Sequence, residues 1–288
     1  MVRLLFLTAA VAALAAPVRA QSAPQSEPKL AIERLALHQY EDGPMLPSGY
    51  EFVPGETAYF SCRIAGFATQ SGNEARAVKL RWHMRLVDPS GVPIDKDRSG
   101  AIEESLSAQD KDWVPKFLAT FSVPAFAPSG TYHIPVTIQD EVAGAETTGE
   151  LSFEVRGHDV QPSDTLTIRN FAFVRAADDK VAMRPAIYTP GDTLWAKFDI
   201  TGYKFGEGNQ FSVDYGLAIL NANGDQVFAQ PAAASDAHQS FYPQRYVPGE
   251  LSLHLDNTVA KAPYTLVIII HDKVGNQNYE TRQPFQVQ

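Results

Sequence analysis

The chain contains an internal repeat, and this repeat constrains the fold more than any local signal does. Residues 30–67 can be laid against residues 166–203 without a gap, and identical residues recur along both segments. The identical pairs are Leu30/Leu166, Ile32/Ile168, Ala36/Ala172, Asp42/Asp178, Pro54/Pro190, Gly55/Gly191, Thr57/Thr193, Ile64/Ile200 and Gly66/Gly202. Because the resemblance continues to the end of both halves, we infer that one module of about 125 residues was duplicated.

Apolar and polar residues alternate in both copies with the period of a half-buried β-strand. The alternating apolar positions are Leu80, Trp82, Met84 and Leu86 in the first copy and Val213, Tyr215, Leu217 and Ile219 in the second. Both segments run into a tight turn, at residues 88–91 and 221–224, with Asp or Asn at the first position and Gly at the last. We therefore expect two hairpins, whose return strands begin at Val92 and Gln226.

The end of each copy repeats the same pattern. The alternating residues there are Tyr132, Ile134, Val136 and Ile138 in one copy and Tyr264, Leu266, Ile268 and Ile270 in the other. Turns follow at residues 140–144 and 272–276, and a last strand carries Phe153 or Phe285. The segment around Ile268 is apolar on both faces, which predicts either a central strand or a strand that is covered by the neighbouring module. No stretch shows a helical period, so we expect an all-β protein.

Two short motifs resemble those of bacterial immunoglobulin-like (Ig-like) and fibronectin type III-like modules. A Pro-Gly-acid-Thr entry to an alternating strand occurs at residues 54–57 and 190–193, and a Tyr-led strand ends at Asp140 or Asp272. The resemblance implies two tandem Ig-like β-sandwich domains and a role in extracellular recognition, spacing or assembly. With the repeat, it predicts sandwich 1 over residues 30–155, sandwich 2 over residues 166–288 and a short polar linker over residues 156–165.

The first twenty residues have the features of a cleavable export signal. Arg3 is followed by an apolar run to Ala16, and Ala20 lies at the −1 position of a cleavage site before Gln21. The run is too short to be a transmembrane helix, and no second apolar run follows. We therefore predict a periplasmic or secreted protein, without a transmembrane segment, that begins with a disordered leader over residues 21–29.

The charge of the chain argues against a nucleic-acid-binding protein, and its cysteine content excludes a protein stabilised by internal disulfides. The net charge is −9, and neither copy has a basic stripe, so nucleic acid is not an expected partner. Cys62 is the single cysteine, so an intramolecular disulfide is impossible. It aligns with Phe198 on the inward face of a strand, where we expect a buried, inert thiol. Because hydrolase and zinc-protease signatures are absent, we expect no enzymatic activity and no cofactor.

One acidic segment has the spacing of a partial calcium loop. Asp95, Asp97 and Ser99 place oxygen atoms on alternate residues, and Gly100 follows them. The bidentate acid that such a loop needs at its twelfth position is Leu106 here. Calcium is thus one interpretation of this segment, and a solvated acidic loop is the other.

Loops that keep their length but change their chemistry are candidates for binding. Residues 80–115 and 213–248 align without a gap, yet the loop is acidic in the first copy and small and aromatic in the second. In the second copy this loop carries five residues that could bind a sugar ring or a partner protein: Phe241, Tyr242, Tyr246, His238 and Arg245. The alternative is that these aromatic rings fold back over the edge of the sandwich.

Tyr59 and Trp195 form a second candidate surface, because alternation places both on the outward face of the strand that follows the Pro-Gly motif. A binding face, a contact between modules, and cover by a neighbouring loop are all compatible with this pattern.

Three functions are compatible with this chain. The first is a non-enzymatic binding or assembly protein that recognises a protein or a glycan through sandwich loops. The second is a structural spacer of an envelope complex, which a rigid contact between modules with featureless loops would favour. The third is a periplasmic chaperone of the pilus-assembly kind, which would need an exposed apolar edge strand with Arg or Lys at its base.

Overall fold

The computed structural model describes residues 29–72 and 75–288. The expected export signal and the leader up to residue 28 lie outside this range. The described chain is all-β, as predicted, with a single three-residue 3-10 helix. The strands of the first half are β1 Ala31–His38, β2 Glu51–Phe52, β3 Thr57–Ala65, β4 Gln70–Ser71, β5 Arg76–Met84, β6 Arg98–Leu106, β7 Lys116–Ser122, β8 Gly130–Asp140 and β9 Ala145–Val155. In the second half they are β10 Thr167–Val174, β11 Ile187–Tyr188, β12 Thr193–Thr201, β13 Phe211–Leu220, β14 Gln226–His238, β15 Tyr246–His254, β16 Pro263–Asp272 and β17 Gln277–Val287, and η1 is Glu207–Asn209.

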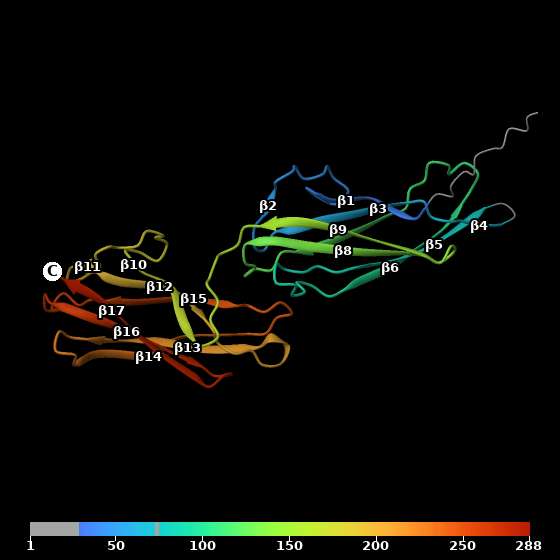
Figure 1. Cartoon of the computed structure of the whole chain (residues 1–288). Helices are drawn as coiled ribbons and strands as arrows, with labels where there is room; N and C mark the ends of the chain where they lie inside the picture. Colours follow the sequence, from blue (N-terminus) through green and yellow to red (C-terminus); the bar gives the residue numbers. More distant parts are fainter. Residues whose placement is uncertain (1–28, 73–74) are drawn as a thin grey trace, which may run out of the picture.

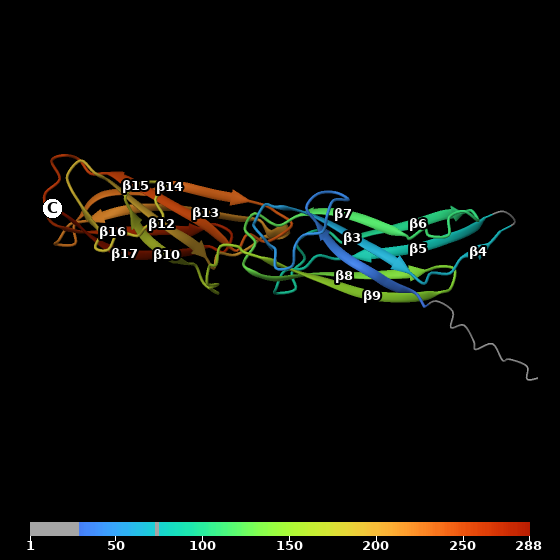
Figure 2. The ribbon, with the colours of Figure 1, turned by 90° about the horizontal axis from the view of Figure 1, so that it is seen from above.

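Each half of the chain forms a three-stranded sheet and a larger sheet. In the first half the strand orders are β1-β3-β7 and β2-β9-β8-β5-β4, and β6 pairs with β5. In the second half they are β10-β12-β15 and β11-β17-β16-β13-β14. The two groups of sheets lie end to end in both views of the ribbon (Figures 1 and 2), and the residues between β9 and β10 form no strand.

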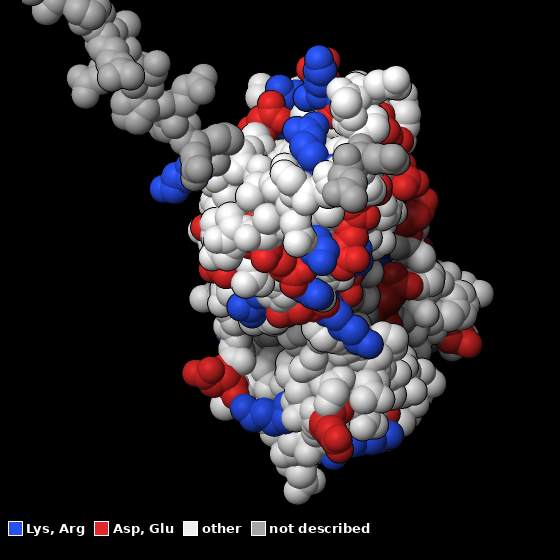
Figure 3. Space-filling view, turned by 90° about the vertical axis from the view of Figure 1, so that its right-hand side faces the viewer, with Lys and Arg blue, Asp and Glu red and all other residues white. Residues whose placement is uncertain are grey.

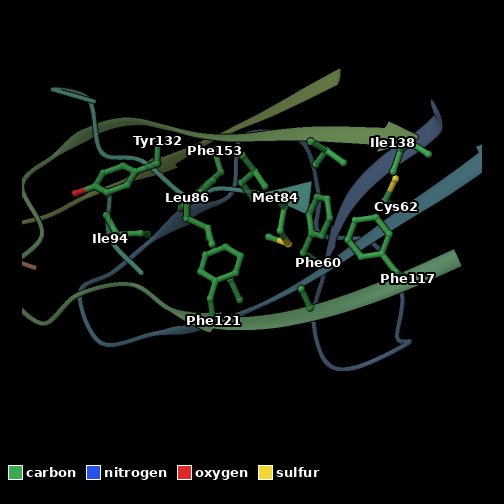
Figure 4. Close-up of a cluster of buried hydrophobic side chains, with 14 of the residues drawn as sticks. Phe60, Cys62, Met84, Leu86, Ile94, Phe117, Phe121, Tyr132, Ile138 and Phe153 are labelled. Carbon is green, nitrogen blue, oxygen red and sulfur yellow. The ribbon is translucent and has the colours of Figure 1, made fainter. Parts of the chain in front are cut away.

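Strand alternation builds a separate apolar cluster in each half. The first cluster contains the inward residues of β3, β5, β7, β8 and β9, and several of them are drawn in Figure 4. Cys62 belongs to it and is fully buried, as predicted, because its strand position faces the opposite sheet. The second cluster is built from β10, β12, β13, β15, β16 and β17.

The structure confirms most of the predicted strands and corrects one of them. As expected, β16 is central, because it pairs with both β13 and β17. The second hairpin also returns at Gln226, where β14 begins. The first does not return at Val92 as a strand, since only an isolated bridge joins Val87 to Pro93. Hydrogen bonds flank this bridge on both sides, from the N–H of Asp88 to Val92 and from the N–H of Ile94 to Leu86, but the pairing ends there and the return strand β6 begins at Arg98 instead.

Within the described ranges, no helix has the length and apolar character needed to cross a bilayer.

Candidate functional site

The junction between the two halves is organised around Asp88, whose side chain is completely buried. Asp88 begins the turn after β5, and its Oδ1 atom accepts hydrogen bonds from the backbone N–H groups of Ser90 and Val92, both at 2.8 Å. These bonds are typical of an Asp that starts a tight turn. They leave Oδ2 free to accept bonds from the second half of the chain.

Two residues of the loop between β14 and β15 reach this carboxylate. The Tyr242 hydroxyl donates to Oδ2 of Asp88 at 2.9 Å, and the Arg245 guanidinium donates to the same atom at 2.7 Å. The guanidinium also lies over the Tyr242 ring, 5.7 Å from its centroid. Tyr242 is buried as part of the first apolar cluster, and this burial raises the pKa of its phenol. The carboxylate of Asp88 is therefore paired and hydrogen-bonded, as a buried charge must be.

Further contacts involve Tyr246 and the residues between β9 and β10. The Tyr246 ring packs edge-on against Phe126, with centroids 5.5 Å apart, and it lies tilted against the His158 ring at 5.1 Å. Nε2 of His158 lies 2.8 Å from Oδ2 of Asp199 on β12, and Asn170 donates to the same oxygen at 2.7 Å. The Tyr246–Phe126 packing thus joins the two halves, and the bond from His158 to Asp199 ties the segment between β9 and β10 to the second half.

The five predicted loop residues lie near one another, but they do not form an exposed platform. Tyr242 and Tyr246 are buried, and Arg245 is occupied by Asp88. Phe241 is 51% exposed and faces solvent. His238 lines a cavity of about 430 Å³ at the junction, together with Tyr242. The rings turn inward because a buried carboxylate 154 residues away in the sequence accepts the Tyr242 hydroxyl, a contact that strand periodicity cannot reveal.

Tyr59 and Trp195 are half-buried on β3 and β12. These strands are the middle strands of two separate three-stranded sheets, so the structure places the two residues in different halves. They do not combine with the loop residues into one surface.

Two of the three candidate calcium ligands are paired with basic side chains, and the third lies on a strand. Asp95 pairs with Arg98, and Asp97 lies 3.3 Å from His83 and 3.4 Å from Arg85. Ser99 belongs to the extended strand β6, which does not wrap around an ion as a calcium loop does. In residues 29–72 and 75–288, no group of three or more His, Cys, Asp or Glu side chains could hold a metal ion.

An apolar pocket at the free end of the second half is the site that sequence reasoning missed. It has a volume of about 540 Å³ and opens beside the C-terminal strand β17, at the end of the molecule marked C in Figure 1. Its lining includes Ile219, Val227, Phe228, Leu253, Leu255, Val259, Tyr264, Phe285 and Val287, with Asn221, Asn223, His254 and Asp256 as polar members. We call this site the tip pocket.

The tip pocket lies where both sheets have an unpaired edge. β14 is the last strand of one sheet and β15 is the last strand of the other. A register shift between Ile219 and Leu220 accompanies the start of β14, and both Val227 and Phe228 line the pocket. They are 56% and 39% exposed, respectively. The sequence signal for this pocket was the pair of apolar residues Val227 and Phe228 shortly after the turn at residues 221–224. The alternation of apolar and polar residues does not show, however, whether a pocket beside such residues is open or filled.

Charge at the opposite end of the molecule is mixed. Figure 3 looks onto the end of the first half, where Lys and Arg side chains are interspersed with Asp and Glu and the described residues form no continuous basic patch.

Comparisons with known proteins identify no relative. No protein-family model and no curated protein matches this chain. Among solved structures, BspA_C_WT is 10% identical over 88% of this chain and 99% of its own, with a TM-score of 0.29. A family 123 glycoside hydrolase from Clostridium perfringens is 12% identical over 43% of this chain and 27% of its own, also at 0.29. The alkylpurine DNA glycosylase AlkC from Pseudomonas fluorescens is 13% identical over 45% and 31%, at 0.27. TM-scores this low carry no argument about function.

Proposed function

We propose that this chain is a secreted or periplasmic, non-enzymatic binding or assembly protein built from two tandem Ig-like sandwiches that arose by duplication. The tip pocket is the observation that carries the proposal, because it offers a mostly apolar cavity at a free end of the molecule. Pockets of this size, apolar with a few polar groups, are the usual form of a binding site.

Matching contacts in the two halves support the duplication. Asp140 accepts hydrogen bonds from the N–H groups of Val142 and Ala143 through Oδ1, and from Ala68 through Oδ2. Asp272 repeats this arrangement with Val274, Gly275 and Lys204. The repeated bonds tie equivalent turns to equivalent strands, which is what two copies of one module would retain.

The lining of the tip pocket favours a protein partner over a glycan. Sugars are bound by hydrogen-bonding groups together with exposed aromatic faces. The tip pocket has four polar members and the partly exposed ring of Phe228, but most of its lining is aliphatic. Aliphatic walls suit the apolar anchor residues that dominate protein interfaces. The chaperone alternative is less well supported, since neither Lys nor Arg is among the described residues that line the pocket.

A structural spacer is the second candidate function. The buried contact between Asp88 and the Tyr242 and Arg245 side chains favours it, because this contact would hold the halves at a fixed spacing. A spacer would not need the tip pocket.

The proposal is tested by replacing exposed apolar residues at the tip. The purified protein and its Val227→Asp variant are immobilised and exposed to cell-envelope extract of the source organism. Val114→Asp is the matched control, because Val114 is a 42% exposed valine of the first half. We expect a partner that the wild type and the control retain and that Val227→Asp loses. Equal retention by all three proteins would reject the tip as the binding site and favour the spacer.

A further inference from the structure

We propose that the tip pocket is a socket for an aromatic side chain presented on a loop of another protein. This inference rests on the proposed function and specifies the chemistry of the partner. It follows from a comparison of the tip pocket with the place where Tyr242 enters the first half.

In the first half, Tyr242 occupies a socket at the end of the apolar cluster. Leu86, Ile94, Tyr132 and Phe153 belong to the same apolar cluster as Tyr242 and are labelled in Figure 4, and Ile94 lines the cavity at the junction together with Tyr242. Asp88 adds the polar group that receives the hydroxyl. All four residues are at most 6% exposed, although a cavity of about 430 Å³ remains beside Ile94 and Tyr242.

The tip pocket has the same walls in the second half. Ile219, Val227, Tyr264 and Phe285 line it at the positions that align with those four residues. Tyr132 donates its hydroxyl to the carbonyl of Pro128, and Tyr264 donates to Ala260, each at 3.0 Å and four residues back. The tyrosines are therefore anchored in the same way in both places.

The polar group of the socket is also repeated. Asn221 aligns with Asp88 and starts the equivalent turn. Its Oδ1 atom accepts hydrogen bonds from the N–H groups of Asn223 and Asp225, both at 2.9 Å, just as Asp88 accepts from Ser90 and Val92. The carboxamide nitrogen of Asn221 takes the place of the Asp88 oxygen that meets the tyrosine.

The two places differ in whether an aromatic side chain from another part of the chain, which we call the plug, fills them. Ile94 is 6% exposed under Tyr242, whereas its counterpart Val227 is 56% exposed. Asp88 is 1% exposed, whereas Asn221 is partly exposed. The tip thus leaves a cavity of about 540 Å³ where the first half receives a side chain.

The first socket also indicates what its counterpart at the tip would accept. It holds a tyrosine on a loop between two strands, so the tip continues the design of an interface that already exists within this chain. Because Asn221 is neutral, the partner needs no cation in place of Arg245. One N–H group of the Asn221 carboxamide donates to Oδ2 of Asp225 at 3.2 Å, and the other would meet an acceptor, such as a tyrosine hydroxyl or a backbone carbonyl.

The first half of a second copy offers no equivalent of the Tyr242 loop, because the aligned loop between β6 and β7 has Gln109 in place of Tyr242 and Asp112 in place of Arg245. In a second copy Tyr242 itself is already bound to Asp88, which leaves Tyr40 and Phe241 as its most exposed loop rings. We take a different protein with an exposed Tyr or Phe on a loop as the partner, and a second copy is an outcome of the test.

The experiment uses the plug of this chain as its probe. A synthetic peptide of residues 238–246 (HQSFYPQRY) is titrated into the purified protein, and the methyl resonances of Val227, Leu255 and Val287 are followed by NMR. The same peptide with Phe241, Tyr242 and Tyr246 all replaced by Ala is the control, because each of these rings could enter the pocket. The protein variant Asn221→Asp/Asp225→Val copies Asp88 and Val92 into the tip and should bind the wild-type peptide at least about tenfold more tightly than the unmodified protein does.

Shifts at the tip methyl groups that depend on the aromatic rings of the peptide, strengthened in the double variant, support the proposal. Absence of shifts with both proteins overturns it. Equal binding of the two peptides overturns it too, because the rings would then contribute nothing. If p-cresol shifts these methyl groups but the peptide does not, the pocket takes small molecules and the proposal fails. Concentration-dependent shifts without peptide would identify a second copy as the occupant and would also overturn it. Loss of partner capture by Val227→Asp, combined with no peptide binding, would reject this inference while leaving the proposed function intact.

Discussion

The hydroxyl of Tyr242 donates a 2.9 Å hydrogen bond to the buried carboxylate of Asp88, and this bond joins the two halves of the chain. Arg245 supplies the positive charge that a buried carboxylate requires. One loop of the second half thereby completes the apolar cluster of the first.

Replacing Asp88 by Asn should weaken this junction without disturbing the turn. Asn221 accepts the equivalent two turn bonds through its carboxamide oxygen, so Asn at position 88 can keep them. The variant loses the charge-assisted bonds to Arg245 and Tyr242, and we expect the free energy of unfolding in urea to fall by about 1–3 kcal/mol. Asp97→Asn is the control, because Asp97 is half-exposed and should change stability by less than about 0.5 kcal/mol. Equal effects of the two variants would contradict this account.

Tyr242 and its neighbour Phe241 should differ sharply on truncation. Tyr242→Ala removes a ring from the first apolar cluster, and we expect a loss of about 3 kcal/mol because a cavity remains. Tyr242→Phe keeps the ring and should cost about 1 kcal/mol. Phe241→Ala should cost less than about 0.5 kcal/mol, since Phe241 is 51% exposed. Urea unfolding measures the stability of all three variants. If Phe241→Ala lowered the free energy of unfolding as much as Tyr242→Ala does, the conclusion that Tyr242 rather than Phe241 packs in the first apolar cluster would be wrong.

Strand positions could be predicted from the sequence because alternation is a local property. The burial of Cys62 followed from its alignment with Phe198. The return strand expected at Val92 was wrong, because only residues 92–94 pair with residues 86–88 and the strand itself begins at Arg98.

The role of the loop residues could not be predicted in the same way. Phe241 and Tyr242 are adjacent aromatic residues, and only the second has a carboxylate to reach. That carboxylate belongs to a turn far away in the sequence, so local chemistry does not decide which ring turns inward. The tip pocket escaped prediction for the related reason that aligned apolar residues are covered in one half and open in the other.

High pH should destabilise the protein through its buried tyrosines. Burial raises the pKa of Tyr132 and Tyr188 to about 12, and it also raises the pKa of Tyr203 and Tyr242. Above about pH 10 the unfolded chain releases phenol protons that the folded chain retains. The free energy of unfolding should therefore fall as pH rises from 10 to 12, and it should not change through these groups below pH 9. Thermal melting from pH 8 to 11.5 tests this, and Tyr188→Phe should make the fall less steep. An unchanged slope in Tyr188→Phe would contradict the prediction.

Cys62 should be unreactive while the protein is folded. Its thiol is fully buried, and burial raises its pKa to about 12, so the thiolate that reacts with alkylating agents is scarce at pH 8. We expect iodoacetamide to modify Cys62 only after urea is added, as measured by intact mass. A Cys62→Ala/Ser252→Cys variant, with an exposed thiol on β15, is the control and should react in the native state. Rapid native modification of Cys62 would show that the first cluster opens.

Calcium should have little effect on stability. Asp95 and Asp97 are paired with Arg98, His83 and Arg85, and binding of an ion would have to break these contacts. A ligand that binds only the folded state raises the melting temperature, so the comparison is between melts in calcium and in chelator. We expect a difference below about 1 °C. A rise of several degrees that disappears in Asp95→Ala and Asp97→Ala would instead establish the acidic segment as a calcium site.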